Sequence, residues 1–347
     1  MLSRFSSNVI LSKVRAMYSK HMTKRDYDLL LACKSVSEIA YFLKHRSGVY
    51  SQILEKLDES KVRRGQLENL IRKKIFRDSI SICRYELSVG EQFAQYIIKK
   101  TEVEQILHTL RLLLAGKSPD LIYTMPIFFS KHASIDFPSL TKVKNYKEFL
   151  DSISNSIYSR LLPEFDFKKD KSVNFLPKVE IKLYTYLYDT IFEVIKNRTQ
   201  GNARRELYEI FNSYVDLFNF TRIIRLKQYY NMDLTVLYSF LLPFGTFKQK
   251  HLRDMINVSD YKEVFSRIRS TSVGRKIAKI KFNYVDELPL RINYELCNHY
   301  IRFSSNPSVV MFSYITLTEI ELSNIINIIE GTRYSVASGE ILKNLIQ

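Results

Sequence analysis

The residues whose types and spacing could do chemistry lie on one predicted helix in the middle of the chain. Asp216, Asn219, Arg222 and Arg225 follow one another at three-residue steps, with Lys227 close behind. On a helix these steps keep the first four side chains on roughly one face. Two interpretations fit this face: a polar network within the helix that fixes domain packing, or a binding surface for acidic groups.

Other combinations of polar residues do not indicate a catalytic, metal or cofactor site. The sequence contains no HExxH motif, no glycine-rich phosphate-binding loop and no nucleophile elbow. Cys297 and His299 are two residues apart, but no second pair completes a zinc site. Glu319 and Glu321 are also two residues apart and point to different faces of a helix. We therefore predict that the chain is not an enzyme and binds no metal or cofactor.

The composition predicts an all-α fold. The 347 residues include only nine Gly and eight Pro, and 46% of them are apolar. So few turn-forming residues favour helices over sheets, and the length is sufficient for two or three domains. A helix that spans a membrane needs about 18 consecutive apolar residues, and the sequence contains no such run. The net charge of +17 fits either compositional drift or a basic surface for an anionic partner.

Two patterns with a period near 110 residues predict a triplicated chain. In the first, an acid opens an apolar helical run at Glu104, Asp216 and Glu321, at intervals of 112 and 105 residues. Asparagines follow the last two acids after three residues, at Asn219 and Asn324.

In the second pattern, a short polar link leads into an acid and a helix. Its glutamates are Glu38, Glu148 and Glu263, at intervals of 110 and 115 residues. Tyr50 and Tyr158 follow the first two, and Val273 takes the tyrosine's place in the third copy. Together the patterns divide the chain into three similar helical domains, at 1–125, 126–240 and 241–347.

The spacing of apolar residues also predicts individual helices and loops. Long helices are expected over Val62–Tyr85, Glu91–Ala115 and Val179–Lys196. Exposed connections are expected over Lys117–Asn145, Pro163–Lys178 and Asn197–Arg205. The acid-free first 25 residues resemble a transit peptide, but helical spacing continues into Leu29–Leu31 without a break. We interpret them as the first helix of the folded chain.

Several short motifs follow one another in a characteristic order along nearly the whole chain. They are Ser12–Met17, Leu29–Ala32 and Ser35–Ile39 near the start, Val215–Lys227 in the middle and Glu319–Gly331 near the end. In this order they resemble the opening, the central helix and the closing helix of one protein of the V/A-type rotary ATPases. This protein is designated C in bacteria and archaea and d in eukaryotes.

The resemblance implies a funnel of three similar helical domains around a pseudo-threefold axis. It implies a rotor adaptor that links the central stalk to the membrane proteolipid ring, carries torque for ATP-driven ion transport or ATP synthesis, and binds no nucleotide. Such a chain lies at the cytoplasmic face of a membrane, which it contacts through the ring. The candidate structural or interface residues are then Asp216, Asn219, Arg222, Arg225, Glu321 and Asn324.

The net charge leaves one alternative open, a basic helical scaffold that binds nucleic acid. The basic runs Lys61–Arg64 and Arg72–Lys74 could contact phosphates or form solvated helix faces. The scaffold predicts a continuous basic stripe, and binding that weakens steeply with salt. The adaptor predicts scattered charge, stable protein partners and no nucleic acid.

Overall fold

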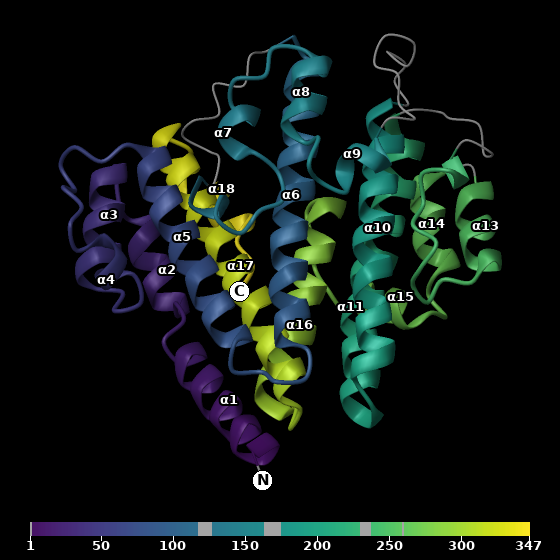
Figure 1. Cartoon of the computed structure of the whole chain (residues 1–347), viewed down its shortest axis with the longest axis horizontal. Coiled ribbons are helices and arrows are strands. Elements are labelled where there is room, and N and C mark those ends of the chain that lie inside the picture. The colour runs from purple at the N-terminus through teal and green to yellow at the C-terminus, as the bar shows by residue number, and fades with distance from the viewer. Residues whose placement is uncertain (1, 117–126, 163–174, 230–236, 259) are drawn as a thin grey trace. The chain divides into compact units, whose positions relative to one another are not determined.

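The computed structural model describes residues 2–116, 127–162, 175–229, 237–258 and 260–347. Over these residues the secondary structure consists of helices joined by turns, with no strand (Figure 1). The predicted all-α fold class is therefore confirmed.

The same order of elements, short helices followed by two long ones, occurs three times along the chain. The first set is α2 (Lys24–Leu31), α3 (Val36–His45), α4 (Ser51–Leu54), α5 (Arg64–Cys83) and α6 (Gly90–Leu114). The second set is η2 (Ile127–Phe129), α7 (Phe137–Leu140), α8 (Tyr146–Ser152), α9 (Tyr158–Leu161), α10 (Phe175–Arg198) and α11 (Gly201–Tyr229). The third set is α13 (Gln249–Asn257), α14 (Tyr261–Arg267), α15 (Ser272–Ile277), η3 (Val285–Glu287), α16 (Leu288–Phe303) and α17 (Pro307–Arg333). Helix α1 (Leu2–Tyr18) precedes the first set, and α18 (Ser338–Lys343) follows the third.

The second repeated sequence pattern marks the start of a short helix in each set. Ser35 Oγ accepts a hydrogen bond from the backbone N–H of Glu38 at 3.1 Å and caps α3. Asn145 caps α8 through the N–H of Glu148 at 3.0 Å. Asp260 caps α14. An oxygen-bearing side chain at the N-cap satisfies an otherwise unpaired helix N–H, which explains the recurring polar link.

The chain forms two compact units that do not follow the order of the sequence. Unit 1 consists of Met1–Ala94, Leu121–Phe128 and Tyr294–Gln347. Unit 2 consists of Gln95–Asp120 and Phe129–Asn293. Each unit has its own apolar core, and the division into three domains stays a prediction.

The core of unit 1 is built around α17. Its apolar residues, including Ile325 and Ile328, pack with Leu30, Ile39 and Ile71 of the first helices. By length and composition α17 could cross a membrane, although the sequence predicted no such segment; 83% of its most apolar stretch is buried. Its place at the centre of unit 1 accounts for this hydropathy.

The predicted long helices are confirmed as α5, α6 and α10, with small differences at their ends. The predicted loop Asn197–Arg205 is wrong, because only Thr199 and Gln200 separate α10 from α11. Gly201, at φ +54°, lets the chain turn within these few residues.

The other two predicted loops extend beyond the described residues. Residues 117–126 and 163–174 lie outside them. The remainder of the first loop contains η2 and α7, and the remainder of the second begins α10.

Candidate functional site

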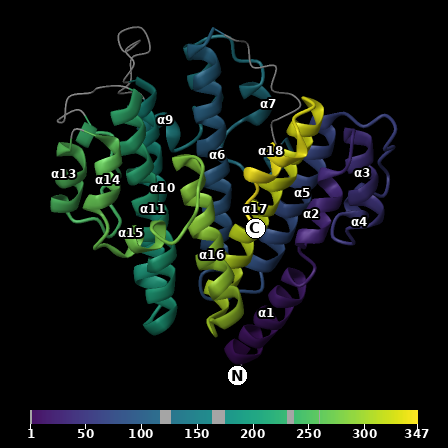
Figure 2. The same ribbon diagram turned by 180° about the vertical axis from the view of Figure 1, so that it is seen from behind.

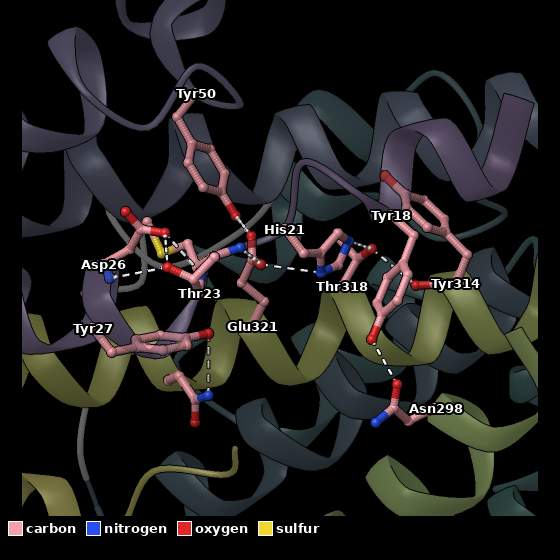
Figure 3. Close-up of polar contacts among 12 residues, drawn as sticks. Tyr18, His21, Thr23, Asp26, Tyr27, Tyr50, Asn298, Tyr314, Thr318 and Glu321 are labelled. Carbon is pink, nitrogen blue, oxygen red and sulfur yellow. Dashed lines mark hydrogen bonds and ion pairs between the residues drawn. The ribbon is translucent and has the colours of Figure 1, made fainter. Parts of the chain in front are cut away.

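A buried glutamate in the middle of α17 connects this helix to the first residues of unit 1. The carboxylate of Glu321 is 4% exposed. It accepts hydrogen bonds from the hydroxyl of Tyr50 at 2.6 Å and from the backbone N–H of Met22 at 2.9 Å. Nδ1 of His21 lies 3.0 Å from the same carboxylate (Figure 3). One side chain on α17 thus connects to two segments that lie 271 and 299 residues earlier.

The second residue of this motif, Asn324, lies one turn further along α17. Its side-chain amide donates to the backbone oxygen of Ile346 at 2.7 Å and accepts from the N–H of Ile346 at 2.9 Å. It also donates to the hydroxyl of Tyr27 at 3.2 Å. Asn324 therefore fixes the segment after α18 and a helix from the N-terminal region to the same turn of α17.

A matching arrangement occurs in unit 2, on α6. Glu102, 2% exposed, accepts hydrogen bonds from both the N–H and the hydroxyl of Ser134. The hydroxyl of Tyr158 donates to its other oxygen at 2.8 Å. As with Glu321, a tyrosine and a backbone N–H from different segments meet one buried carboxylate.

The third arrangement, on α11, has no tyrosine donor among the described residues. Asp216 is fully buried and accepts from the N–H of Thr246 at 2.8 Å, from the Thr246 hydroxyl, and from the N–H of Phe247 at 3.2 Å. Asn219 exchanges two hydrogen bonds with the backbone of Leu242, at 2.8 and 3.0 Å. This repeats the relation of Asn324 to Ile346.

We call each of these arrangements a carboxylate clamp: a buried acid on a long helix that accepts hydrogen bonds from a separate segment. The clamped backbone donors Met22, Ser134 and Thr246 recur at equal intervals of 112 residues. The clamped donor therefore occurs once for each of the three sets of helices, at the same spacing along the chain.

The buried acid of the clamp on α6 lies two residues before the acid predicted from the sequence. Glu104, predicted as the repeated acid, is exposed, whereas Glu102 is buried. Residues two apart face different sides of a helix, so only one of the two can face the core. The signal that identifies Glu102 is Gln105, which follows it at the spacing of Asn219 after Asp216.

The two arginines of α11 form ion pairs with acids on other elements. Arg222 forms an ion pair with Glu180 of α10 and donates to the backbone oxygen of Phe240 at 3.2 Å. Arg225 lies 2.6 Å from Asp286 of η3. The interpretation that these arginines help to fix packing fits these contacts, which lie within unit 2.

The environments of Glu321 and Asp216 shift the pKa of these two acids in opposite directions. Burial alone would raise the pKa of Glu321, but hydrogen bonds and charge from His21, with those from Tyr50 and Met22, lower it below its usual value. Burial raises the pKa of Asp216 to about 6, because the hydrogen bonds from Thr246 and Phe247 only partly offset the loss of solvent. Burial beside a carboxylate raises the pKa of Tyr50 and of Tyr158.

These clamps hold segments together and present no open reaction site. The carboxylates are buried, and each accepts hydrogen bonds from nearby protein groups. Within the described ranges, no group of three or more His, Cys, Asp or Glu could hold a metal ion. The arrangement is that of a structural connection between long helices and the segments they clamp.

No curated protein is similar enough to the chain to count as a match. Residues 10–344, however, match the model of a family described as ATP synthase (C/AC39) subunit. The match begins within α1, ends just after α18 and includes all three clamps. The chain therefore belongs to the ATP synthase (C/AC39) subunit family, whose members are designated C or d in the V/A-type ATPases.

Proposed function

We propose that the chain is the non-catalytic rotor adaptor of a V/A-type ATPase. In this role it links the central stalk to the membrane proteolipid ring at the cytoplasmic face. It transmits torque during ATP-driven ion transport or ATP synthesis. The observation that carries the proposal is the family match over residues 10–344.

The clamps support this proposal because an adaptor that carries torque must be stiff. Glu102 and Asp216 each clamp a segment that follows their own helix, whereas Glu321 clamps a segment near the start of the chain. Buried, hydrogen-bonded links between closely packed helices resist deformation. The connections therefore follow the chain from set to set, and the last set returns to the first.

Affinity purification tests the proposal. The tagged full-length chain would be isolated from native membranes in mild detergent, and the proteins that co-purify identified by mass spectrometry. We expect the proteins of the proteolipid ring and of the central stalk. Recovery of nucleic acid without these proteins would overturn the adaptor and favour the basic scaffold.

A second measurement addresses torque. Membranes that contain an Ile223→Ala variant would be compared with wild type for ATP hydrolysis and for ion transport. Ile223 is fully buried in the core of unit 2, and its truncation costs about 2–5 kcal/mol of stability. We expect less ion transport per ATP hydrolysed, or loss of assembly. Unchanged coupling together with a destabilised chain would contradict the stiff-adaptor role.

A further inference from the structure

One short stretch of unit 2 is strongly basic. Lys262–Lys281 contains seven Lys or Arg residues and a single acid, Glu263. These twenty residues therefore carry +6 of the net charge of +17. We call this stretch the basic segment; it includes most of α14, the turn after it, α15 and the first residues beyond α15.

The apolar residues of the basic segment anchor it to the core of unit 2. Val264, Ile268, Val273 and Ile277 are all buried in that core. Helices α14 and α15 both contact α11 (green and teal in Figures 1 and 2). The cations between these anchors are therefore presented on a folded surface, and Lys279 and Lys281 flank Ile280, which packs against the same core.

Several of these cations are available to a partner. Arg267, Arg269, Lys279 and Lys281 are exposed, and none takes part in an ion pair with another described residue. Lys276, in contrast, is paired with Glu209 at 2.9 Å. A group of like charges without internal partners produces a local positive potential that attracts anions.

The basic runs singled out in the sequence of unit 1 are partly neutralised. Arg64 pairs with Glu68 and Glu330. Lys74 pairs with Asp78 at 2.5 Å. Ion pairs thus hold part of these runs, whereas in the basic segment only Lys276 pairs with an acid among the described residues.

Exposed apolar groups lie directly beyond the basic segment. Tyr284, three residues after Lys281, is 67% exposed. Leu290, in the first turn of α16, is 38% exposed. Clusters of Lys and Arg are attracted to anionic headgroups, and tyrosine is enriched at the interface between membrane and water. The combination fits a lipid surface better than it fits a purely polar partner.

We propose that the basic segment binds the headgroups of an anionic lipid bilayer. The family places the chain in a membrane-bound ATPase complex, so such a surface is within its environment. The attraction depends on the charge of the headgroups and weakens with ionic strength. This contact is direct and additional to the one through the ring, and it does not depend on the rotor role.

Two variants of the full-length chain with equal net charge test the proposal. The first replaces Arg267, Arg269, Lys279 and Lys281 by Gln. The matched control replaces four exposed residues of unit 1 by Gln, namely Arg63, Arg77, Lys56 and Lys73. Each variant loses four positive charges from the +17 of the chain. Circular dichroism and thermal melting would check that both remain folded.

The measurement is co-sedimentation with vesicles of phosphatidylcholine alone, or mixed with phosphatidylserine. We expect the wild type and the control to bind the phosphatidylserine vesicles, and neither to bind phosphatidylcholine alone. The basic-segment variant should bind about 100-fold more weakly, since each Lys or Arg near an anionic membrane contributes to the attraction. Equal loss in both variants, or no binding by the wild type, would overturn the proposal.

Affinity purification of the same basic-segment variant separates this proposal from the proposed function. We expect it to recover the stalk and ring proteins as the wild type does. If the variant instead loses one of these proteins and keeps its vesicle binding, the basic segment is a protein interface and the lipid proposal is wrong. If the wild type recovers no other ATPase protein, the proposed adaptor function is contradicted and the lipid proposal is not affected.

Discussion

Glu321 and Asp216 are each followed by an asparagine three residues later, but their environments shift the pKa of the two carboxyl groups in opposite directions. Glu321 has His21 and the hydroxyl of Tyr50 as partners, and its pKa is lowered. It therefore contributes stability above its ordinary pKa, and this contribution is lost as pH falls. Asp216 relies on Thr246 and Phe247, and its raised pKa reverses the dependence.

Replacing Asp216 by Asn tests this reversal. The pKa of Asp216 rises from 3.8 to about 6 on folding. Protonation thus stabilises the fold, and the contribution is lost as pH increases from about 4 to about 6, by up to roughly 3 kcal/mol. Asn keeps the acceptor oxygen and cannot ionise. We expect the free energy of urea unfolding to fall less over this range in Asp216→Asn than in the wild type; parallel curves would contradict the assignment.

Only part of each clamp could be predicted from the sequence. The repeat spacing identified Asp216, Glu321, Tyr50 and Tyr158, but it contained no information on which tyrosine meets which acid. The partner of Tyr50 is Glu321, on the last long helix. A hydrogen bond across such a separation depends on tertiary packing, and helical periodicity describes only local faces.

At the scale of elements, the turn between α14 and α15 depends on a glycine. A Cβ at Gly274 would lie 1.8 Å from the backbone oxygen of Ile268. Because the clash is with backbone, a side chain cannot move away to relieve it. Gly339 of α18 has nothing within 4 Å of its Cβ position, so it provides a matched control.

Gly274→Ala should therefore destabilise the chain by about 1–3 kcal/mol, the usual cost of overpacking. Gly339→Ala should leave stability unchanged or raise it slightly, by less than about 1 kcal/mol. Thermal unfolding followed by circular dichroism gives both values. Equal melting temperatures for the two variants would show that the turn tolerates a side chain.

The interruption between α1 and α2 shows the limit of periodicity for predicting elements. Apolar spacing predicted one continuous helix, but α1 ends at Tyr18 and α2 begins at Lys24. Within the gap, His21 and Met22 reach Glu321. Thr23 then caps α2. The polar contacts of the gap explain the break, and they depend on a distant helix that the local pattern does not contain.

At the scale of the whole molecule, the clamps of the two units should respond separately. Glu321→Ala leaves the N–H of Met22 without its acceptor, and Asp216→Ala does the same to Thr246. A buried polar group without a partner costs about 1–3 kcal/mol. We expect amide hydrogen exchange to rise about tenfold or more around the affected segment only, measured by mass spectrometry. A rise in both segments in either variant would contradict separate responses.

The all-α class was predictable because composition and apolar spacing act along the whole chain. The two compact units were not, because unit 1 combines α2 and α3 with α17. Sequence repeats indicate similar segments but not which copy packs against which. The family match confirms the family that the motifs indicated. The three-domain arrangement stays a prediction.

The contact between Glu321 and Met22 has a consequence for how the chain folds during its synthesis. A ribosome makes Met22 about 300 residues before Glu321, so the first helices emerge with their central partner still missing. Contacts between residues so far apart in the sequence form late, and proteins that depend on them fold slowly. Until α17 is released, Leu30, Ile39 and Tyr50 lack part of their core. Nascent chains of this protein should therefore require chaperones that shield apolar surface until translation is nearly finished.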